Sequence, residues 1–381
     1  MTPATPATPA SPDGADGASP ASSRPASASA PLPASAALLH AEIAEQPAVV
    51  ARQLASAADA IGRVAALVAE RGIRHVAIAA RGTSDNAAIY AQYLLGIRNR
   101  LPVALAAPSL TTLYETTPRY DDALVIGISQ SGASPDVAGV VAAAREQGAL
   151  TLALTNDPAS TLGRTAEHVA GLDAGPERSI AATKTYTAEL VALAALSVAL
   201  DGDERDRAAL AALPDQLARA LETEPAATRV AADQVELERV VVLGRGIGYA
   251  TAREWSLKLR EIAGVWAEAW SAADFAHGPL AMVGPGTVVL ATVPRGAARD
   301  SLLADLARLR GERGAELLVL SDDPAARRAG RWSIQVPAGH PEWLDPIVSI
   351  VPAQLHCLRL ALARGVDPGV AGGLTKVTLT R

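Results

Sequence analysis

The chain repeats one strand–loop–helix plan, and this repeat limits the possible folds more than any other feature of the sequence. The segment "VAIAARG" at 76–82 aligns with "VVVLGRG" at 240–246, and at the same offset "ALVIGISQSGASPD" at 123–136 aligns with "TVVLATVPRGAARD" at 287–300. In each copy an apolar run is followed by a Gly-containing loop and a helical stretch. Apolar strands that alternate with helices indicate parallel βαβ units with helices on both sheet faces. We therefore predict an α/β fold of two tandem doubly wound domains with parallel sheets.

The predicted organisation has four parts. Residues 1–36 hold eight of the 26 prolines and almost no large apolar side chains, so they cannot bury enough surface to offset the entropy of ordering them. We predict a disordered tail there. Residues 37–212 form the first domain, residues 213–368 form the second, and residues 369–381 form a C-terminal tail.

Charge and composition exclude several classes of protein. The net charge is −6 and the Lys and Arg residues are spread along the chain, which argues against nucleic-acid and membrane-surface partners. The longest apolar run noted, at 190–200, is shorter than the roughly 18 residues that a membrane span needs. The single cysteine, Cys357, excludes a disulfide framework and a cysteine zinc site and is expected in a buried helix. We predict a cytoplasmic protein without metal or cofactor.

Hydroxyl groups gather in the loop of one repeat only. The first copy has Ser129, Ser131 and Ser134, where the second copy has Val, Arg and Ala. In an open parallel sheet, ligands bind beyond the carboxyl ends of the strands, and a helix N-terminus there favours an anion. Thr83 and Ser84 leave the neighbouring strand at the same edge, and Ser84 or Asp85 is a candidate cap of the helix that follows. A phosphate site is one interpretation, and an ordinary turn with a helix cap is the other.

A second group of polar residues follows the first strand of the second copy. Glu254, Lys258 and Glu261 are spaced i, i+4 and i+7, so they share one face of a helix. His277 lies in an apolar stretch before Gly-Pro. An exposed ion pair and a structural histidine would explain these residues. Alternatively, they supply acid–base chemistry near neutral pH.

Several longer motifs resemble the sugar isomerase (SIS) family in its tandem, flavodoxin-like form. They are "RGTS", "SQSGASPD", "ERSIAATKTYTAEL", "GRGIGYATAREWSLKLREIAG", "AADFAHGP" and the terminal "LTKVT". The similarity covers about residues 38–381. The members it resembles most are the isomerase half of glucosamine-6-phosphate synthase and the stand-alone glucosamine-6-phosphate deaminases, and the "SAADF" stretch looks more like the deaminases.

The resemblance implies roles for the matching positions. The residues that would hold the sugar phosphate are Ser84, Ser129, Gln130, Ser131 and Ser134, with Thr83 close by. Glu261 would move a proton between C1 and C2, and Glu254 and Lys258 would line the C1 side. Lys376 would reach the open-chain carbonyl from the C-terminal tail. His277 would open the sugar ring from the neighbouring subunit of a homodimer.

These roles predict an enzyme that converts glucosamine 6-phosphate to fructose 6-phosphate and ammonia. The alternatives are a synthase-type isomerase that uses ammonia or a separate glutaminase, another sugar-phosphate isomerase or deglycase, and a sugar-phosphate sensor without catalysis. A glutaminase needs an N-terminal cysteine nucleophile, and the sequence begins Met-Thr with its only cysteine at 357. Sensors that contain SIS domains usually also carry a DNA-binding domain, and residues 1–36 cannot form one.

Overall fold

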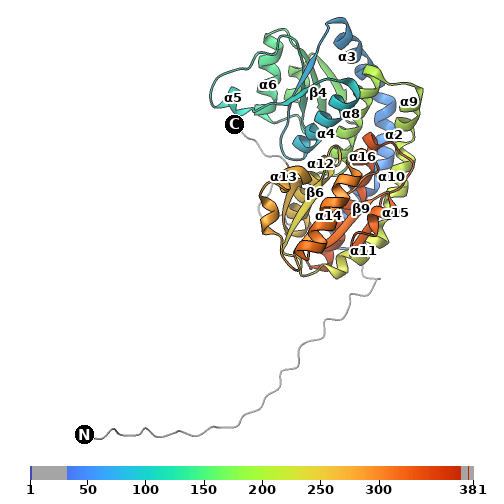
Figure 1. The fold of residues 1–381 in the computed structure, drawn as a ribbon. Coiled ribbons are helices and arrows are strands. Elements are labelled where there is room, and N and C mark those ends of the chain that lie inside the picture. Colours follow the sequence, from blue (N-terminus) through green and yellow to red (C-terminus); the bar gives the residue numbers. More distant parts are fainter. Residues whose placement is uncertain (2–31, 370–375, 377–381) are drawn as a thin grey trace. The chain divides into compact units, whose positions relative to one another are not determined.

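The structure is a computed structural model that describes residues 1, 32–369 and 376. Two five-stranded parallel sheets lie at its centre (Figure 1). The first sheet has the order β2-β1-β3-β4-β5 and contains β1 (His75–Ala79), β2 (Val103–Leu105), β3 (Ala123–Ile128), β4 (Leu150–Thr155) and β5 (His168–Gly171). The second has the order β10-β9-β8-β6-β7 and contains β6 (Arg239–Gly244), β7 (Trp266–Ser271), β8 (Val288–Thr292), β9 (Glu316–Ser321) and β10 (Trp332–Gln335).

The two sheets have the same topology. If β1 is matched with β6 and the remaining strands follow in chain order, each strand has the same neighbours in both sheets. All the strand pairs are parallel. The prediction of two tandem doubly wound domains is therefore confirmed.

Helices connect the strands and cover the sheets. Those up to the end of the first repeat are α1 (Ala34–Ala44), α2 (Gln46–Ser56), α3 (Ala58–Glu70), α4 (Thr83–Asn99), α5 (Ser109–Thr112), α6 (Pro135–Glu146), α7 (Thr161–Thr165) and α8 (Lys184–Asp201). Those that follow are α9 (Glu204–Ala211), α10 (Leu213–Leu221), α11 (Glu224–Asp233), α12 (Gly248–Ala263), α13 (Ala272–Phe275), α14 (Arg299–Arg313), α15 (Pro324–Arg327) and α16 (Asp345–Ala363), with 3-10 turns η1 (Pro279–Met282) and η2 (Glu342–Leu344).

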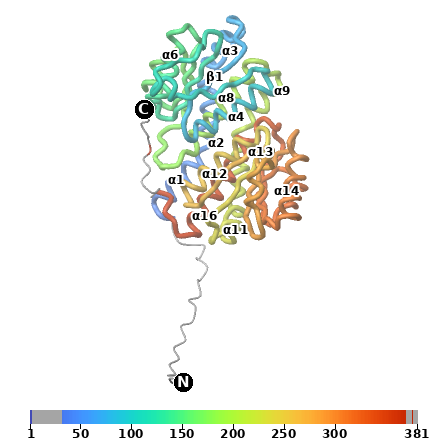
Figure 2. Tube along the Cα trace, turned by 60° about the vertical axis from the view of Figure 1, so that its left-hand side comes forward, coloured from blue at the N-terminus to red at the C-terminus, as the bar shows by residue number. Residues whose placement is uncertain are grey.

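The central strands are apolar because helices cover both faces of each sheet. Every residue of β3 and β4 is buried. In the first repeat α3, α4 and α8 pack together on one face, and α5, α6 and α7 lie on the other. In the second repeat α11, α12 and α16 cover one face (Figure 2). A strand enclosed in this way has no solvated side, so β3 contains only apolar residues and glycine, and β4 adds only the buried Thr151 and Thr155.

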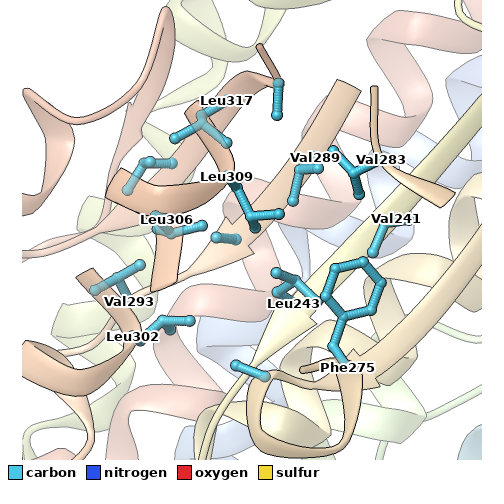
Figure 3. Packing of buried hydrophobic residues seen from close by; sticks show 14 of the residues in the cluster. Val241, Leu243, Phe275, Val283, Val289, Val293, Leu302, Leu306, Leu309 and Leu317 are labelled. Carbon is cyan, nitrogen blue, oxygen red and sulfur yellow. The ribbon is translucent and has the colours of Figure 1, made fainter. Parts of the chain in front are cut away.

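A separate apolar core lies beneath α14 in the second repeat. Leu302, Leu306 and Leu309 extend from one face of this helix onto Val289 of β8 and Leu317 of β9 (Figure 3). Each of these five side chains is at most 2% exposed. The spacing of the three leucines at i, i+4 and i+7 is that of a helix with one apolar stripe.

Helices α4 and α12, which occupy equivalent places in the two repeats, contact each other and join the repeats. The N-terminal helices also cross the predicted domain boundary at 212, because α1 packs against α16 and α2 packs against α10. Gln46 of α2 donates a hydrogen bond to the side-chain oxygen of Gln354 in α16 at 2.8 Å.

The first helix begins at Ala34, before the end of the predicted tail. The rest of that prediction, residues 2–31, lies outside the described residues, as do 370–375 and 377–381 of the C-terminal tail.

Within the described part of the chain, one segment is long and apolar enough to cross a membrane by length and composition. This segment is Glu342–Ala363, and 83% of its apolar window is buried inside the protein. It contains Cys357, which is fully buried and unpaired, as the sequence predicts. The burial is that of a core helix, which passes the same test.

Candidate active site

The loop after β3 presents hydroxyl groups at the carboxyl edge of the first sheet. Residues 129–134 connect β3 to the N-terminus of α6. Ser129 Oγ accepts a hydrogen bond from the backbone N–H of Gly132 at 3.2 Å, and Ser131 Oγ accepts one from Ala133 at 3.3 Å. Because the hydroxyl oxygens are acceptors here, each O–H can still donate to an anion.

The other two predicted residues of this loop have different local roles. Ser134 directly precedes α6, but its side chain makes no capping hydrogen bond. The interpretation of the loop as a turn with a hydroxyl cap therefore does not explain this serine. Gln130 is fixed through its backbone, where its carbonyl oxygen accepts from the N–H of Asn156 at 3.0 Å. The helix N-terminus and the half-buried hydroxyls together make a suitable environment for an anion.

Glycine is required at position 132 by both conformation and space. Gly132 has a φ of +61°, and a Cβ built on it would lie 1.9 Å from Ser160 Oγ and 2.8 Å from Thr155 Oγ1. Ser160 is itself engaged, because its Oγ caps α7 by accepting the N–H of Gly163 at 3.2 Å. The loop thus packs directly against the segment after β4, and that contact holds its shape.

The corresponding loop of the second repeat already holds a carboxylate of its own chain. The backbone N–H of Ala297 lies 3.2 Å from both carboxylate oxygens of Glu342. A Cβ on Gly296, which corresponds to Gly132, would lie 1.9 Å from Cδ of Glu342. A fixed negative charge in this place opposes the binding of a phosphate. The site of the first repeat therefore has no counterpart of the same chemistry in the second.

The predicted residues of α12 meet those of α4 across the junction of the repeats. Thr83 Oγ1 donates to Glu254 Oε1 at 3.2 Å and accepts from Lys258 Nζ at 3.1 Å. Asn86 donates its side-chain N–H to Glu254 Oε2 at 2.7 Å, and its side-chain oxygen accepts from Arg253 at 3.0 Å. A continuous polar network thus connects the N-terminus of α4 to α12.

This network lies at the same sheet edge as the serine loop. Strands β1 and β3 are neighbours, with Ala79 in register with Gly127. Thr83 and Ser129 therefore follow adjacent strand ends. Helix α4 begins at Thr83 with Gly82 as its cap, so the predicted cap at Ser84 or Asp85 is wrong. The Ser84 side chain lies 2.7 Å from the Glu189 carboxylate instead.

One lysine lies between the two carboxylates of α12. Lys258 Nζ is 3.3 Å from Glu254 and also pairs with Glu261. The side chains of Glu254 and Lys258 are almost fully buried, whereas that of Glu261 is 22% exposed. The three residues share a face as the spacing predicts, but this face is not the solvated one that a simple exposed ion pair requires.

Burial controls the charge states in this cluster. It raises the pKa of Glu254 to about 7, with Lys258 opposing the shift and the Glu261 charge adding to it. Burial opposes the charged form of Lys258, but the two neighbouring carboxylates outweigh it and raise its pKa. Lys258 is therefore a permanent cation. Glu261 is the most exposed member of the cluster.

Lys376 of the C-terminal tail is held by an ion pair. Its Nζ lies 2.9 Å from Glu177, whose side chain is fully buried. Glu177 also accepts hydrogen bonds from the backbone N–H groups of Thr183 and Thr185. Burial opposes ionisation of Glu177, but Lys376 and the hydrogen bonds from the Thr185 hydroxyl and the Thr183 backbone together lower its pKa. The carboxylate thus fixes the lysine to the segment before α8.

His277 is separate from the other predicted residues. It is exposed and lies between α13 and η1. Among the described residues, no hydrogen bond or ion pair joins it to the serine loop, to Lys376 or to the α12 cluster. Its predicted role across a subunit boundary stays a prediction.

Three polar residues in this region have no role in the sequence-based prediction. They are Asn86, which bonds Glu254; Glu177, which holds Lys376; and Glu189, which bonds Ser84. Asn86 lies two residues after the motif "RGTS", and Glu177 and Glu189 lie within "ERSIAATKTYTAEL". The sequence carried a signal for Glu189, which is a carboxylate within the apolar stretch "TAELVALAAL". A helix this apolar is buried, so its polar residues are buried with it. Within residues 32–369, no group of three or more His, Cys, Asp and Glu side chains is arranged to hold a metal ion.

The fold and the site together define the class of protein. This is a tandem doubly wound α/β protein in which one repeat supplies a hydroxyl-rich loop at a helix N-terminus and the other supplies a buried carboxylate–lysine cluster. Two segments, 71–199 and 235–364, match the SIS domain family. The chain belongs to the SIS domain family and contains two tandem copies of that domain.

Relatives with related sequences agree with this assignment. The chain is 33% identical over 339 residues to glutamine–fructose-6-phosphate aminotransferase [isomerizing] of Methanothermobacter thermautotrophicus, and the match covers 88% of this chain and 56% of the relative. The chain thus spans little more than half the length of such curated relatives. Among solved structures, a putative phosphosugar isomerase from Silicibacter pomeroyi is 34% identical with a TM-score of 0.79, covering 87% of this chain and 99% of that one. The C-terminal domain of glucosamine-fructose-6-phosphate aminotransferase from Francisella tularensis is 28% identical with a TM-score of 0.77, covering 86% and 96%.

Proposed function

We propose that the protein is a sugar-phosphate aldose–ketose isomerase, and that it releases ammonia from glucosamine 6-phosphate. One observation carries the proposal. The Glu254–Lys258–Glu261 cluster of one repeat is hydrogen-bonded to Thr83, beside the serine loop of the other repeat. A sugar anchored by its phosphate in that loop can extend its other end towards these acid–base groups.

The chemistry follows from the charge states of the side chains. The serine loop, Ser84 and the N-terminus of α6 bind the phosphate. In the open-chain aldehyde, Glu261 removes the proton from C2 and returns it to C1. The C1 oxygen gains a proton and the C2 amine loses one, so the aldehyde becomes an alcohol and the amine becomes an imine. Lys258, a permanent cation, stabilises the negative charge that develops on the C1 oxygen between the two steps. Water then adds to the imine carbon and ammonia leaves, giving fructose 6-phosphate.

Lys376 and His277 complete the proposed site. The ammonium group of Lys376, fixed by Glu177, donates to the open-chain carbonyl oxygen. His277 promotes opening of the sugar ring and is contributed by the second subunit of a homodimer. Its exposure and its separation from the rest of the cluster support such a role across a subunit boundary.

A panel of substrates tests the reaction. Purified protein is incubated with glucosamine 6-phosphate, galactosamine 6-phosphate, N-acetylglucosamine 6-phosphate and a fructosamine 6-phosphate, and ammonia and ketose phosphate are measured. Ammonia release from glucosamine 6-phosphate is expected. Glu261→Gln retains the size of the side chain but cannot accept a proton, so the rate should fall by about 10²–10⁴-fold. Binding without turnover of any member of the panel would instead indicate a sensor.

The aminotransferase relatives support a second candidate, an isomerase that works in the direction of synthesis. In that case fructose 6-phosphate with ammonium, or with glutamine and a separate glutaminase, would yield glucosamine 6-phosphate. The same protein preparation is assayed in both directions. Net synthesis at low ammonium concentration, without measurable ammonia release, would favour this candidate.

A further inference from the structure

A buried carboxyl group lies behind the predicted phosphate-binding serine of α4. Glu189 belongs to α8, is 1% exposed, and has Oε1 at 2.7 Å from Ser84 Oγ. Its other carboxyl oxygen, Oε2, is buried without a hydrogen-bond partner among the described residues. The proposed reaction does not use this group.

Burial and two neighbouring carboxyl groups disfavour the ionisation of Glu189. Glu254 and Lys258 face it from α12, and Glu177 faces it from the segment before α8. Lys258 is already shared by two nearer carboxylates. Burial is the largest influence and raises the pKa of Glu189 to about 8; Glu254 and Glu177 add to this shift, and the Ser84 hydrogen bond and Lys258 oppose it. The carboxyl group is therefore mostly protonated at neutral pH.

The protonation state of Glu189 determines what Ser84 can do. A serine hydroxyl has one proton to donate. Beside an ionised Glu189, that proton must point at the carboxylate, and only lone pairs face a phosphate. Beside a protonated Glu189, the carboxyl O–H donates to Ser84 Oγ, and the serine proton is free to donate to the phosphate.

We propose that Glu189 is a positioning residue that orients the hydroxyl of Ser84 towards the sugar phosphate, and that it does so only in its protonated form. The inference rests on the proposed function, in which Ser84 holds the phosphate. Its consequence is that the affinity for a sugar phosphate decreases as the solution becomes alkaline, while the phosphate itself stays a dianion.

The test measures the dissociation constant of sorbitol 6-phosphate by calorimetry from about pH 7 to about pH 9.5. This open-chain probe has neither an amine nor a carbonyl group, and its phosphate titrates near pH 6, so it does not change charge in this range. For the natural protein the dissociation constant should rise about tenfold or more, as expected when one hydrogen bond to a charged oxygen is lost. Glu189→Gln carries a permanent N–H donor in place of the acid and should bind with little dependence on pH.

Two further variants separate this inference from the proposed function. Ser84→Ala should bind weakly at every pH, and the exposed control Glu70→Gln should retain the alkaline loss. Unchanged affinity in Ser84→Ala would overturn the phosphate site itself. If Ser84→Ala binds weakly but the natural protein and Glu189→Gln show the same pH profile, the phosphate site stands and the role of Glu189 is wrong. A flat profile of the natural protein overturns the inference without any variant.

Discussion

Replacing Gly132 by alanine tests whether close packing holds the serine loop in shape. The added Cβ would lie 1.9 Å from Ser160 Oγ, so either the loop or Ser160 must move. Gly72 is a matched control in the same repeat, because its φ of +63° is nearly the same as the +61° of Gly132 but no atom lies within 4 Å of its Cβ position. The two variants therefore share the backbone strain and differ in the steric clash.

The expected difference follows from the two local contacts. Both substitutions place alanine in the left-handed region, which costs roughly 1–2 kcal/mol. In Gly132→Ala alone, displacement of Ser160 also weakens the cap on α7, by about 1 kcal/mol. Overpacking against the neighbouring segment adds roughly 1–3 kcal/mol. Gly132→Ala should thus be less stable than Gly72→Ala by about 2–4 kcal/mol.

Urea unfolding followed by far-UV circular dichroism measures this difference, and calorimetry with sorbitol 6-phosphate measures the effect on the loop. Gly132→Ala should unfold at a lower urea concentration than Gly72→Ala and bind the probe more weakly. Gly72→Ala should bind as the natural protein does. Equal unfolding midpoints in the two variants would show that the loop does not approach Ser160 as closely as the structure indicates.

Three other predictions concern the cluster, the partner subunit and the second loop. Lys258→Met leaves buried carboxylates without their cation and should lower the free energy of unfolding by roughly 3–5 kcal/mol, and a second change, Glu254→Gln, should restore part of the loss in urea titrations. Mixing inactive His277→Ala chains with inactive Ser129→Ala/Ser131→Ala chains should return about a quarter of the natural activity if the histidine acts across the dimer. No recovery despite proven subunit exchange would place the histidine in its own chain. Glu342→Ala removes the acceptor of an exposed N–H, so it should cost only about 0.5–1.5 kcal/mol and leave KM unchanged, whereas a raised KM would place substrate at the second loop.

The order of elements was predictable because it follows from short-range patterns. Each inner strand is a run of mostly apolar residues, although the edge strands β7 and β10 include polar ones, and the loops after the inner strands are marked by glycine and small polar residues. The repeat made the prediction stronger, since the same pattern occurs twice and both sheets have the same strand order. Helical spacing likewise placed Glu254, Lys258 and Glu261 on one face, where the ion pairs of Lys258 now lie.

The environment of these residues was not predictable in the same way. Spacing along a helix shows that side chains share a face, but it does not show what covers that face. Only the packing of α12 against α4 reveals that Glu254 and Lys258 are buried, and burial is what raises the pKa of Glu254. On a solvated helix, the same three residues would form an ordinary exposed ion pair.

The sequence by itself thus determined the two repeats, their parallel sheets, and the hydroxyl-rich loop that occurs in one repeat only. The tertiary structure alone decided which distant residues meet: Ser84 with Glu189, Thr83 with Glu254, and Lys376 with Glu177. The physical reason is that secondary structure depends on neighbours a few positions away. The charge and hydrogen-bonding state of a buried carboxyl group depend on partners brought together by folding.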